Sequence, residues 1–303
     1  MTEVCPSNLI KEQSMNGLLI VNKPEGYTSH DIVNIVRKKL NIKKVGHTGT
    51  LDPNATGVLP ILIGQATKIS KYLVEHKKTY IATLKLGEQR DTGDSEGEII
   101  NQDLNIKVFN NMEIEQILLG LLGRQQQIPP MHSAIKVNGK KLYEYARKGQ
   151  EIEIKPRDIE IYNISLKNYN KKDEVVFEVE CSKGTYIRTL CEDIAKKLGT
   201  IGYMAELQRT KVNEFEIKNA ISLEDLDNVN LQDKLISIEK VFEDKPKIDL
   251  DNRKLELFLN GVQLTHDLND GVYTIYNDNK FIGLATVKNK LLKRDVVIWI
   301  KIW

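Results

Sequence analysis

The sequence has 303 residues, and its 44 basic and 42 acidic side chains give a formal net charge of only +2. A charge that small excludes proteins that bind nucleic acid through a strong overall field, although basic faces can exist within a balanced total. The length and the 41% apolar content allow a large core, so we expect one large domain or a large and a small one.

Cysteine usage and the N-terminus indicate the compartment. The three cysteines, Cys5, Cys181 and Cys191, are odd in number and lack paired or metal-type spacing. This pattern argues against a disulfide framework and predicts a reducing compartment, the cytoplasm. No segment approaches the length of a membrane span, and we expect residues 1–14 to be a flexible extension without the apolar centre of a secretory signal.

The first predicted elements are a strand, a loop and a helix. Residues 18–21 are an apolar run that ends at a Pro-Gly turn. Thr28, with Asp31 three positions later, has the spacing of a capping box at a helix N-terminus. Apolar residues then recur at helical spacing, at Ile32, Val33, Val36 and Leu40.

Two later segments alternate as half-buried strands do. Residues 79–87 place Tyr80, Ala82, Leu84 and Leu86 on one side. Residues 174–181 place Val175, Phe177, Val179 and Cys181 on one side, and a glycine turn and a helix follow. That helix is expected to bury Leu190, Cys191, Ile194 and Leu198 and to stop at Gly199.

The region between these strands is expected to hold a helix and a compact loop. Residues 112–123 carry one helical stripe, made of Ile114, Ile117, Leu118, Leu121 and Leu122. Residues 128–149 then predict a loop, a short strand, a turn and a short helix.

The order of these elements predicts the fold class. Strands and helices alternate irregularly to about residue 240, without a βαβ cadence or a GxGxxG turn, so we expect an α+β domain with a mixed, largely antiparallel sheet over residues 15–245. Residues 253–261 then predict a short helix. Compact strands follow at 271–276, 280–287 and 295–303, which predict a small β-barrel domain over residues 246–303.

One carboxylate, Asp52, stands in the glycine-rich segment VGHTGTLDPNATGVLP, residues 45–60. Gly46, Gly49 and Gly57 allow the backbone to approach a ligand closely, and His47 adds a flat ring to the hydroxyls nearby. The segment therefore predicts a binding loop.

Structural alternatives exist for these residues. Asp-Pro-Asn is also a good turn, and His47 alone would be an ordinary loop histidine. Tyr80 begins an apolar face and alone would be a core residue. The acidic DTGDSEG segment, residues 91–97, lacks the remaining ligands of an EF-hand loop, so we interpret it as a structural turn.

Five segments resemble the bacterial TruB-type tRNA pseudouridine synthases. They occur in the family's order between about Met15 and Phe215, and such a series is far more specific than any one motif. The small C-terminal domain resembles, by position and texture, the PUA domain of many members. The five segments are NKPEGYTSHDIV, GHTGTLDPNATGVLPILIGQATK, KLGEQRDTGDSEG, IPPMHSAIKVNGKKLYEYAR and CSKGTYIRTL.

The resemblance implies a role for each matching residue. Asp52 would be the catalytic aspartate, and Arg188 the arginine that pairs with it. Tyr80 would stack on the target uracil, and Tyr186 and Leu207 would line the same pocket. The weaker predictions, for RNA binding, are Lys23, Lys68, Lys136 and Lys140, and His47 would help to hold the rearranged RNA loop.

Physical chemistry agrees with these roles. A base in folded RNA must be flipped out before an enzyme can act on its glycosidic bond, so the pocket needs an aromatic platform. A guanidinium can orient a carboxylate and favour its ionised form. Arg188 is expected in the first turn of a helix, where a cation is mildly unfavourable unless an anion offsets it.

The resemblance also implies the substrate, which is the T arm of tRNA with uridine 55 as the target. Isomerisation adds no group and changes no oxidation state, so we expect no metal and no cofactor. The aspartate could attack C1' or assist loss of the C2' proton through a glycal, and both routes stay open. We expect a monomer without an obligate protein partner.

Two positions depart from the family pattern, and three other functions compete. Gln208 replaces the first of two arginines, and Arg90 replaces a small hydroxyl residue, which affects expected RNA contacts only. One alternative is an aspartyl-phosphate phosphatase, because LDPNAT loosely resembles DxDxT, but no apolar strand precedes it. The second alternative is a non-catalytic RNA-binding protein. The third is a guide-RNA-dependent synthase, and the lack of an extended basic tail disfavours this third alternative.

Overall fold

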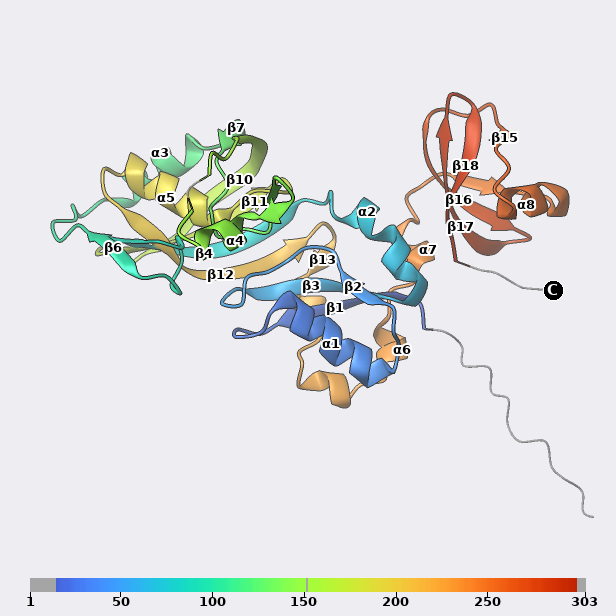
Figure 1. Cartoon of the computed structure of the whole chain (residues 1–303), viewed down its shortest axis with the longest axis horizontal. Coiled ribbons are helices and arrows are strands. Elements are labelled where there is room, and N and C mark those ends of the chain that lie inside the picture. The colour runs from blue at the N-terminus through green and yellow to red at the C-terminus, as the bar shows by residue number, and fades with distance from the viewer. Residues whose placement is uncertain (1–14, 151, 299–303) are drawn as a thin grey trace, which may run out of the picture.

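The protein is described here by a computed structural model that covers residues 15–150 and 152–298. An elongated body is built on one large curved sheet, and a smaller sheet lies beside one end of it (Figure 1). The predicted extension over residues 1–14 and the end of the last predicted strand, from residue 299, lie outside the described residues.

The large sheet is mixed. Strands β3 and β12 run parallel, and the other paired strands of this sheet are antiparallel. Strand β2 (Val45–His47) pairs with β3, and β13 (Phe215–Glu216) pairs with β12. The main order is β1 (Gly17–Lys23), β3 (Thr56–Ile63), β12 (Gly202–Val212), β4 (Lys78–Leu86), β11 (Glu174–Cys181), β10 (Arg157–Tyr169) and β7 (Gly123–Gln127).

The longest helices cover the sheet through apolar stripes. Helix α1 (Ser29–Leu40) packs on β1 and β3, and the predicted capping box of Thr28 and Asp31 begins it. Helices α3 (Asn111–Leu119) and α5 (Ile187–Lys197) pack on the other half of the sheet, over β4, β10 and β11. The alternation predicted for β4 and β11 is confirmed, since each strand buries every second residue.

The remaining elements of the body are short. They are the 3-10 helices Gly64–Ile69, Ile217–Asn219 and Asp225–Asp227, helices α2 (Ser70–Leu73), α4 (Leu142–Ala146), α6 (Leu231–Lys234) and α7 (Ile238–Val241), and strands β5 (Glu88–Arg90), β6 (Ile99–Gln102), β8 (Lys136–Val137) and β9 (Lys140–Lys141).

The C-terminal unit is a five-stranded half-barrel with helix α8 (Asn252–Leu259) packed on it. Leu284 and Val296 join the core formed around Phe242 of the body, and Asp295 contacts Lys71 and Tyr72. The half-barrel is therefore seated on the body. Its strand order is β14 (Lys247–Asp249), β16 (Gly271–Asn277), β17 (Lys280–Lys288), β18 (Leu291–Val297) and β15 (Leu264–Thr265).

Two details of the predicted elements are wrong. The last strand begins at Leu291 instead of Asp295, because the basic segment after the Asn289 turn already pairs with β17. Leu122 is 45% exposed although it was assigned to the buried stripe, because α3 ends at Leu119.

Candidate active site

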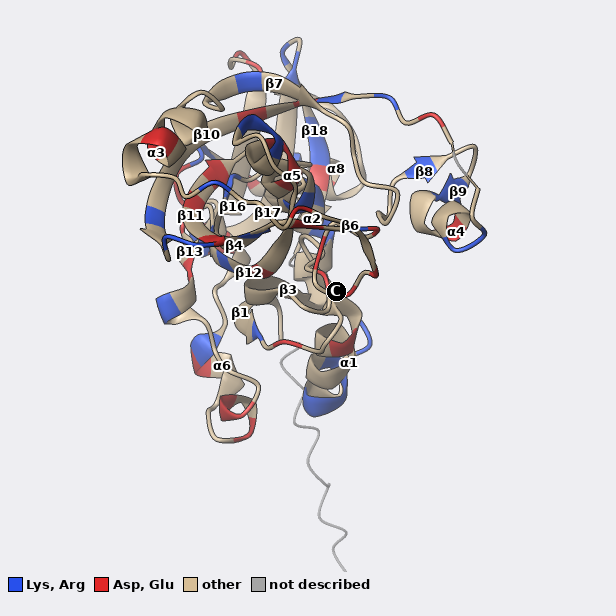
Figure 2. Ribbon diagram, turned by 90° about the vertical axis from the view of Figure 1, so that its left-hand side faces the viewer, with Lys and Arg blue, Asp and Glu red and all other residues tan. Residues whose placement is uncertain are grey.

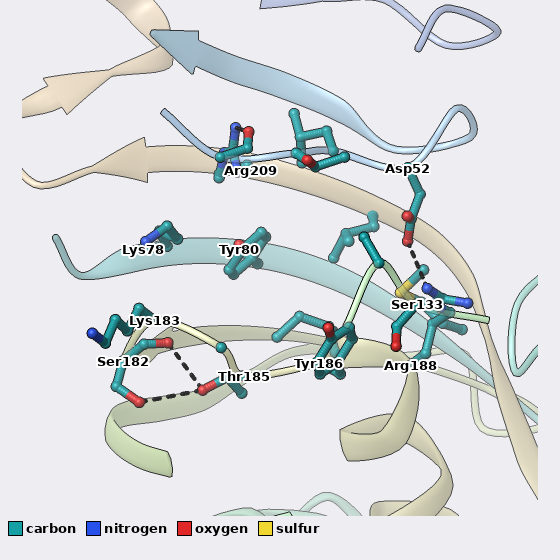
Figure 3. Close-up of a pocket in the computed structure, with 18 of the residues that line it drawn as sticks. Asp52, Lys78, Tyr80, Ser133, Ser182, Lys183, Thr185, Tyr186, Arg188 and Arg209 are labelled. Carbon is teal, nitrogen blue, oxygen red and sulfur yellow. Dashed lines mark hydrogen bonds and ion pairs between the residues drawn. The ribbon is translucent and has the colours of Figure 1, made fainter. Parts of the chain in front are cut away.

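A cavity of about 470 Å³ opens between β4, β12, the β2–β3 loop and the start of α5 (Figure 3). It combines residues from both halves of the chain. The predicted residues that line it are Asp52, Tyr80, Tyr186, Arg188 and Leu207, and further lining residues include Thr48, Gly49, Lys78, Ser133, Lys183 and Arg209.

Asp52 stands in the loop between β2 and β3, with its side chain 38% exposed. The backbone on either side of it is fixed. The hydroxyl of Ser29 accepts a hydrogen bond from Leu51 N at 2.8 Å, and the Ala55 amide donates to Asp52 O at 3.1 Å. The loop thus presents a partly exposed carboxylate from a rigid frame.

The predicted pairing of Asp52 with Arg188 is present. Arg188 Nη2 lies 3.2 Å from Asp52 Oδ2, and the arginine side chain is only 7% exposed. The same guanidinium donates to the carbonyls of His132, at 2.9 Å, and Thr92, at 3.1 Å. These contacts leave the arginine little freedom, so its fixed guanidinium defines the orientation of the Asp52 carboxylate.

A second carboxylate shares this arginine, and the sequence analysis missed it. Asp94 Oδ2 lies 3.4 Å from Arg188 Nη1, and the Asp94 side chain is 5% exposed. It belongs to the DTGDSEG segment that we interpreted as a structural turn, and it does accept turn hydrogen bonds from Thr92 and Glu96. The spacing of a turn and the position of an ion-pair partner coincide in one residue, so sequence alone could not separate them.

Tyr80, Tyr186 and Leu207 form the apolar part of the cavity. Tyr80 is 7% exposed, and burial raises the pKa of its hydroxyl while the nearby Arg209 opposes that rise. Tyr186 is the residue before α5, and both its backbone groups are hydrogen-bonded to the Gln127 side chain. Two aromatic rings and one aliphatic side chain therefore face a common space (Figure 3).

The other predicted residues lie outside this wall. His47 ends β2 just before Thr48 and Gly49, and its Nδ1 accepts from Gly49 N at 3.3 Å. Burial lowers the pKa of His47, and Arg209 adds to the effect.

The four lysines have different surroundings. Lys23 is fully buried, and its ammonium donates to Pro24 O, Tyr27 O and Pro53 O at 2.7 to 3.0 Å. The bond to Pro53 O fixes the backbone of the Asp52 loop directly after the carboxylate. Lys68 donates to Val297 O at 3.3 Å, at the half-barrel. Lys136 and Lys140 are exposed on the β8–β9 hairpin, which the charge-coloured view shows projecting from the body (Figure 2).

The departure at Arg90 has a structural explanation. Its guanidinium donates to Ser95 O and Gly97 O and lies over the Tyr203 ring. The side chain therefore braces its own loop. Gln208 is exposed on β12, where it pairs with Thr56.

Two buried cations of the cavity were not assigned a role from the sequence. Arg209 is 1% exposed and donates through Nε to Val58 O at 2.7 Å and through Nη2 to Gly49 O at 3.2 Å. Lys78 is 9% exposed and donates to His76 O at 2.7 Å and Val74 O at 3.2 Å. Their burial has no signal in the sequence, because Lys78 ends a short basic run and Arg209 follows a polar glutamine.

Within residues 15–150 and 152–298, no group of three or more His, Cys, Asp or Glu side chains is arranged to hold a metal ion. In the same described part, no helix is both long enough and apolar enough to cross a bilayer.

Family models match most of the chain. The model of the TruB family pseudouridylate synthase N-terminal domain matches residues 37–187, and that of the tRNA pseudouridylate synthase B C-terminal domain matches residues 188–243. The chain belongs to the TruB family. The boundary between the two matched regions falls between Ile187 and Arg188, within the wall of the cavity.

Relatives of known name are similar over nearly their whole length. The tRNA pseudouridine synthase B of Francisella philomiragia is 44% identical over 286 residues, which cover 93% of this chain and 94% of the relative. The protein of the same name from Alkaliphilus oremlandii is 45% identical over 285 residues, with 91% and 94% covered.

Solved structures share the fold at lower identity. A Cbf5-Nop10-Gar1 complex contains a chain with a TM-score of 0.67 and 24% identity, covering 94% of this chain and 84% of that one. An H/ACA RNP bound to a substrate RNA containing 2'-deoxyuridine gives a TM-score of 0.68 and 22% identity, with 93% and 85% covered. These likenesses confirm the type of fold, a mixed sheet with helices on it.

Proposed function

We propose that this protein isomerises uridine to pseudouridine in tRNA, at position 55 of the T loop, with Asp52 as the catalytic carboxylate and without a cofactor. The observation that carries the proposal is the Asp52–Arg188 ion pair at one end of a cavity lined by Tyr80 and Tyr186. Membership of the TruB family and the names of the relatives support the substrate and the reaction.

The chemistry asks two things of the carboxylate, ionisation and orientation. Whether it adds to C1' or assists removal of the C2' proton, the reacting form is the anion. Arg188 supplies a fixed positive charge, and its bonds to two backbone carbonyls prevent it from following the substrate. The geometry serves either route equally, so the two routes remain alternatives.

The apolar wall suits a flipped base. Tyr80 offers a ring face, Tyr186 a second aromatic surface and Leu207 an aliphatic one. Stacking in such a pocket compensates for the stacking that the nucleotide loses when it leaves the RNA loop. His47 lies where β2 ends and the Asp52 loop begins, and it is suited to hold the RNA loop in its rearranged form after the base has left it.

RNA outside the pocket would contact basic surface residues. Lys136 and Lys140 are exposed on their hairpin and are available to phosphates. Lys68 lies where the body meets the half-barrel, whereas the buried Lys23 would act through the Asp52 loop. We assign residues 15–245 to the catalytic domain and 246–303 to a PUA-like RNA-binding domain, a label that the five-stranded half-barrel supports.

We further propose a monomer that acts without an obligate protein partner in the cytoplasm. The two cysteines in the described residues, Cys181 and Cys191, are buried and unpaired, in keeping with a reducing compartment.

Tritium release tests the proposed reaction. Formation of the C5–C1' bond expels the hydrogen on C5, so a T-arm stem-loop that carries C5-tritiated uridine should lose tritium, in the presence of EDTA. Asp52→Asn should abolish release, by more than about 10⁴-fold, while stem-loop binding persists. Asp158→Asn, the same change at an exposed position of β10, is the matched control and should release tritium at the unmodified rate.

Two results would contradict the proposal. Full release by Asp52→Asn would remove the carboxylate from the reaction. Tight binding of the stem-loop by the unmodified protein without any release would leave a non-catalytic RNA-binding protein.

A further inference from the structure

The cavity has a second charged end, opposite Asp52. Arg209 and Lys78 line it, while Asp52 and Arg188 occupy the other side, with Tyr80 between the two ends (Figure 3). A Cβ added at Gly49 would lie 3.7 Å from Arg209 Nη1 and 3.8 Å from Lys78 Cε, so the two basic side chains lie beside the same backbone position.

These two cations have no anionic partner within the protein. Arg209 donates to the carbonyls of Val58 and Gly49, and Lys78 to those of Val74 and His76. In the part of the chain that the structure describes, neither forms an ion pair with a carboxylate. Arg188, in the same cavity, forms two.

An uncompensated pair of buried charges is costly. Moving an ion from water into a protein interior is unfavourable by several kcal/mol unless an opposite charge accompanies it. The cost is visible in Lys78, because burial lowers its pKa to about 8 and the neighbouring Arg209 adds to the effect. Burial lowers the pKa of Arg209 in the same way. Such an arrangement is useful where a ligand brings negative charge into the cavity.

The proposed reaction generates an anion at this place. When the C1'–N1 bond breaks, its electron pair leaves with the base and spreads over the ring and its two carbonyl oxygens. Asp52 compensates C1' by adding to it or by assisting loss of the C2' proton. The C5–C1' bond then forms with an electron pair of the ring. On the first route the Asp52–C1' bond breaks and its electron pair returns to the carboxylate, and on the second route C2' regains its proton. The C5 proton is finally lost to solvent while N1 gains one.

We propose that Lys78 and Arg209 are catalytic residues of this reaction, whose charges stabilise the detached uracil anion and retain it while it turns from N1 to C5. The inference rests on the proposed function. Charges that are fixed before the reaction lower the barrier most when they face the place where charge develops. A pair of cations is also less directional than a set of hydrogen bonds, which suits a base that must reorient within the cavity.

Lys78 is the residue to test, because Arg209 also ties β12 to the Asp52 loop. We expect Lys78→Met to lower the single-turnover rate of a T-arm stem-loop about 100-fold, with the dissociation constant changed less than about threefold. Lys78→Arg keeps the charge and should retain most of the rate. The matched control is Lys85→Met on the same strand, because Lys85 is half-buried but has carboxylate partners, Asp173 and Glu174.

A better leaving base should lessen the defect. With 5-fluorouridine at the target position, the detached base is a more stable anion, so glycosidic cleavage should depend less on the cations. We expect the ratio of unmodified to Lys78→Met cleavage rates to fall at least several-fold for this substrate. An unchanged ratio would mean that Lys78 does not act on the leaving base.

Other results would overturn either the role of Lys78 or the proposed function. A weaker affinity and a smaller salt dependence with an unchanged rate would make Lys78 a phosphate contact and overturn the proposal. So would equal effects of Lys78→Met and Lys85→Met, or a Lys78→Arg protein as slow as Lys78→Met. Failure of the unmodified protein to release tritium would instead overturn the proposed function itself.

Discussion

At one end of the cavity Arg188 lies between Asp52 and Asp94, whereas at the other end Arg209 and Lys78 lie among backbone carbonyls. At the first end the protein compensates the positive charge of Arg188 with two carboxylates. The second end keeps its positive charge until a ligand arrives. Arg188 at the first end and Arg209 and Lys78 at the second are all buried, so these cations differ in charge compensation and not in exposure.

The difference separates two tasks. A nucleophile or base must be ionised and correctly aimed before substrate binds, which calls for a permanent partner. A leaving group becomes anionic only during the reaction, so a permanent carboxylate at that end would cancel the stabilisation when it is needed. Substitutions at the Asp52 end should therefore affect both the reaction and folding stability, whereas substitutions at the Lys78 end should affect the reaction and its pH dependence.

The largest effect is expected at the compensated end. Arg188→Met should reduce tritium release at least about 10³-fold, because Asp52 loses the charge that orients it. It should also lower the free energy of unfolding by about 3 kcal/mol, since Asp94 would be left buried without a partner.

A double variant separates these two losses. Adding Asp94→Asn to Arg188→Met removes the unpaired buried charge. The midpoint temperature of thermal unfolding should therefore return towards that of the unmodified protein, while tritium release stays low. Recovery of both quantities together would mean that Arg188 acts only through stability.

A pH dependence is expected at the uncompensated end. Lys78 is charged below a pKa of about 8 and neutral above it, so kcat/KM should be level below pH 8 and should fall towards pH 10, by about tenfold for each pH unit once the lysine is neutral. Glu75, Cys181, Lys183 and Arg209 face Lys78; the thiol of Cys181 has its pKa raised to about 12 by burial and stays protonated.

Arginine substitutions identify the group that titrates. Lys78→Arg should move the fall in kcat/KM to higher pH by at least one unit. Among the described residues, Lys23 is the other lysine whose pKa burial lowers to about 8, so Lys23→Arg is the control. If the fall in kcat/KM moves to higher pH only in Lys23→Arg, the titrating group is Lys23, which holds the Asp52 loop, and not Lys78.

The smallest effect concerns a third carboxylate near Arg188. Burial raises the pKa of Glu192 to about 7, with Asp193 adding to the rise and Arg188 opposing it. Because the folded-state pKa lies above the ordinary value of 4.5, the folded protein loses stability as pH rises through 7. Glu192→Gln should therefore add about 1 to 2 kcal/mol to the free energy of unfolding at pH 8 and almost nothing at pH 5, measured by urea titration. Equal gains at both pH values would mean that ionisation of Glu192 is not the cause.

The sequence allowed much of the fold to be predicted where its pattern was strict. The alternation of β4 and β11 and the capping box of α1 are local signals, and the structure confirms them. Strand β12 was not predicted, because residues 208–211 are polar in succession and interrupt any alternation, and the strand is defined by its partners β3 and β4. Such a strand has no local signal of its own.

The same limit applied to the cavity. Asp52 and Arg188 were assigned from motifs that resemble a family, and the structure brings them together from opposite halves of the chain. Asp94 and Lys78 were not assigned, since a turn aspartate and a strand lysine are ordinary residues. Only the tertiary structure shows that one is a buried partner and the other a buried charge without a carboxylate.

The most direct test of the central claim is to map pseudouridine on a full-length tRNA transcript after incubation with the protein in EDTA, using carbodiimide adducts that stop primer extension. The account predicts one new stop, at position 55, which is present with Asp158→Asn and absent with Asp52→Asn. Stops elsewhere, no stop with the unmodified protein, or a stop at 55 with Asp52→Asn would contradict it.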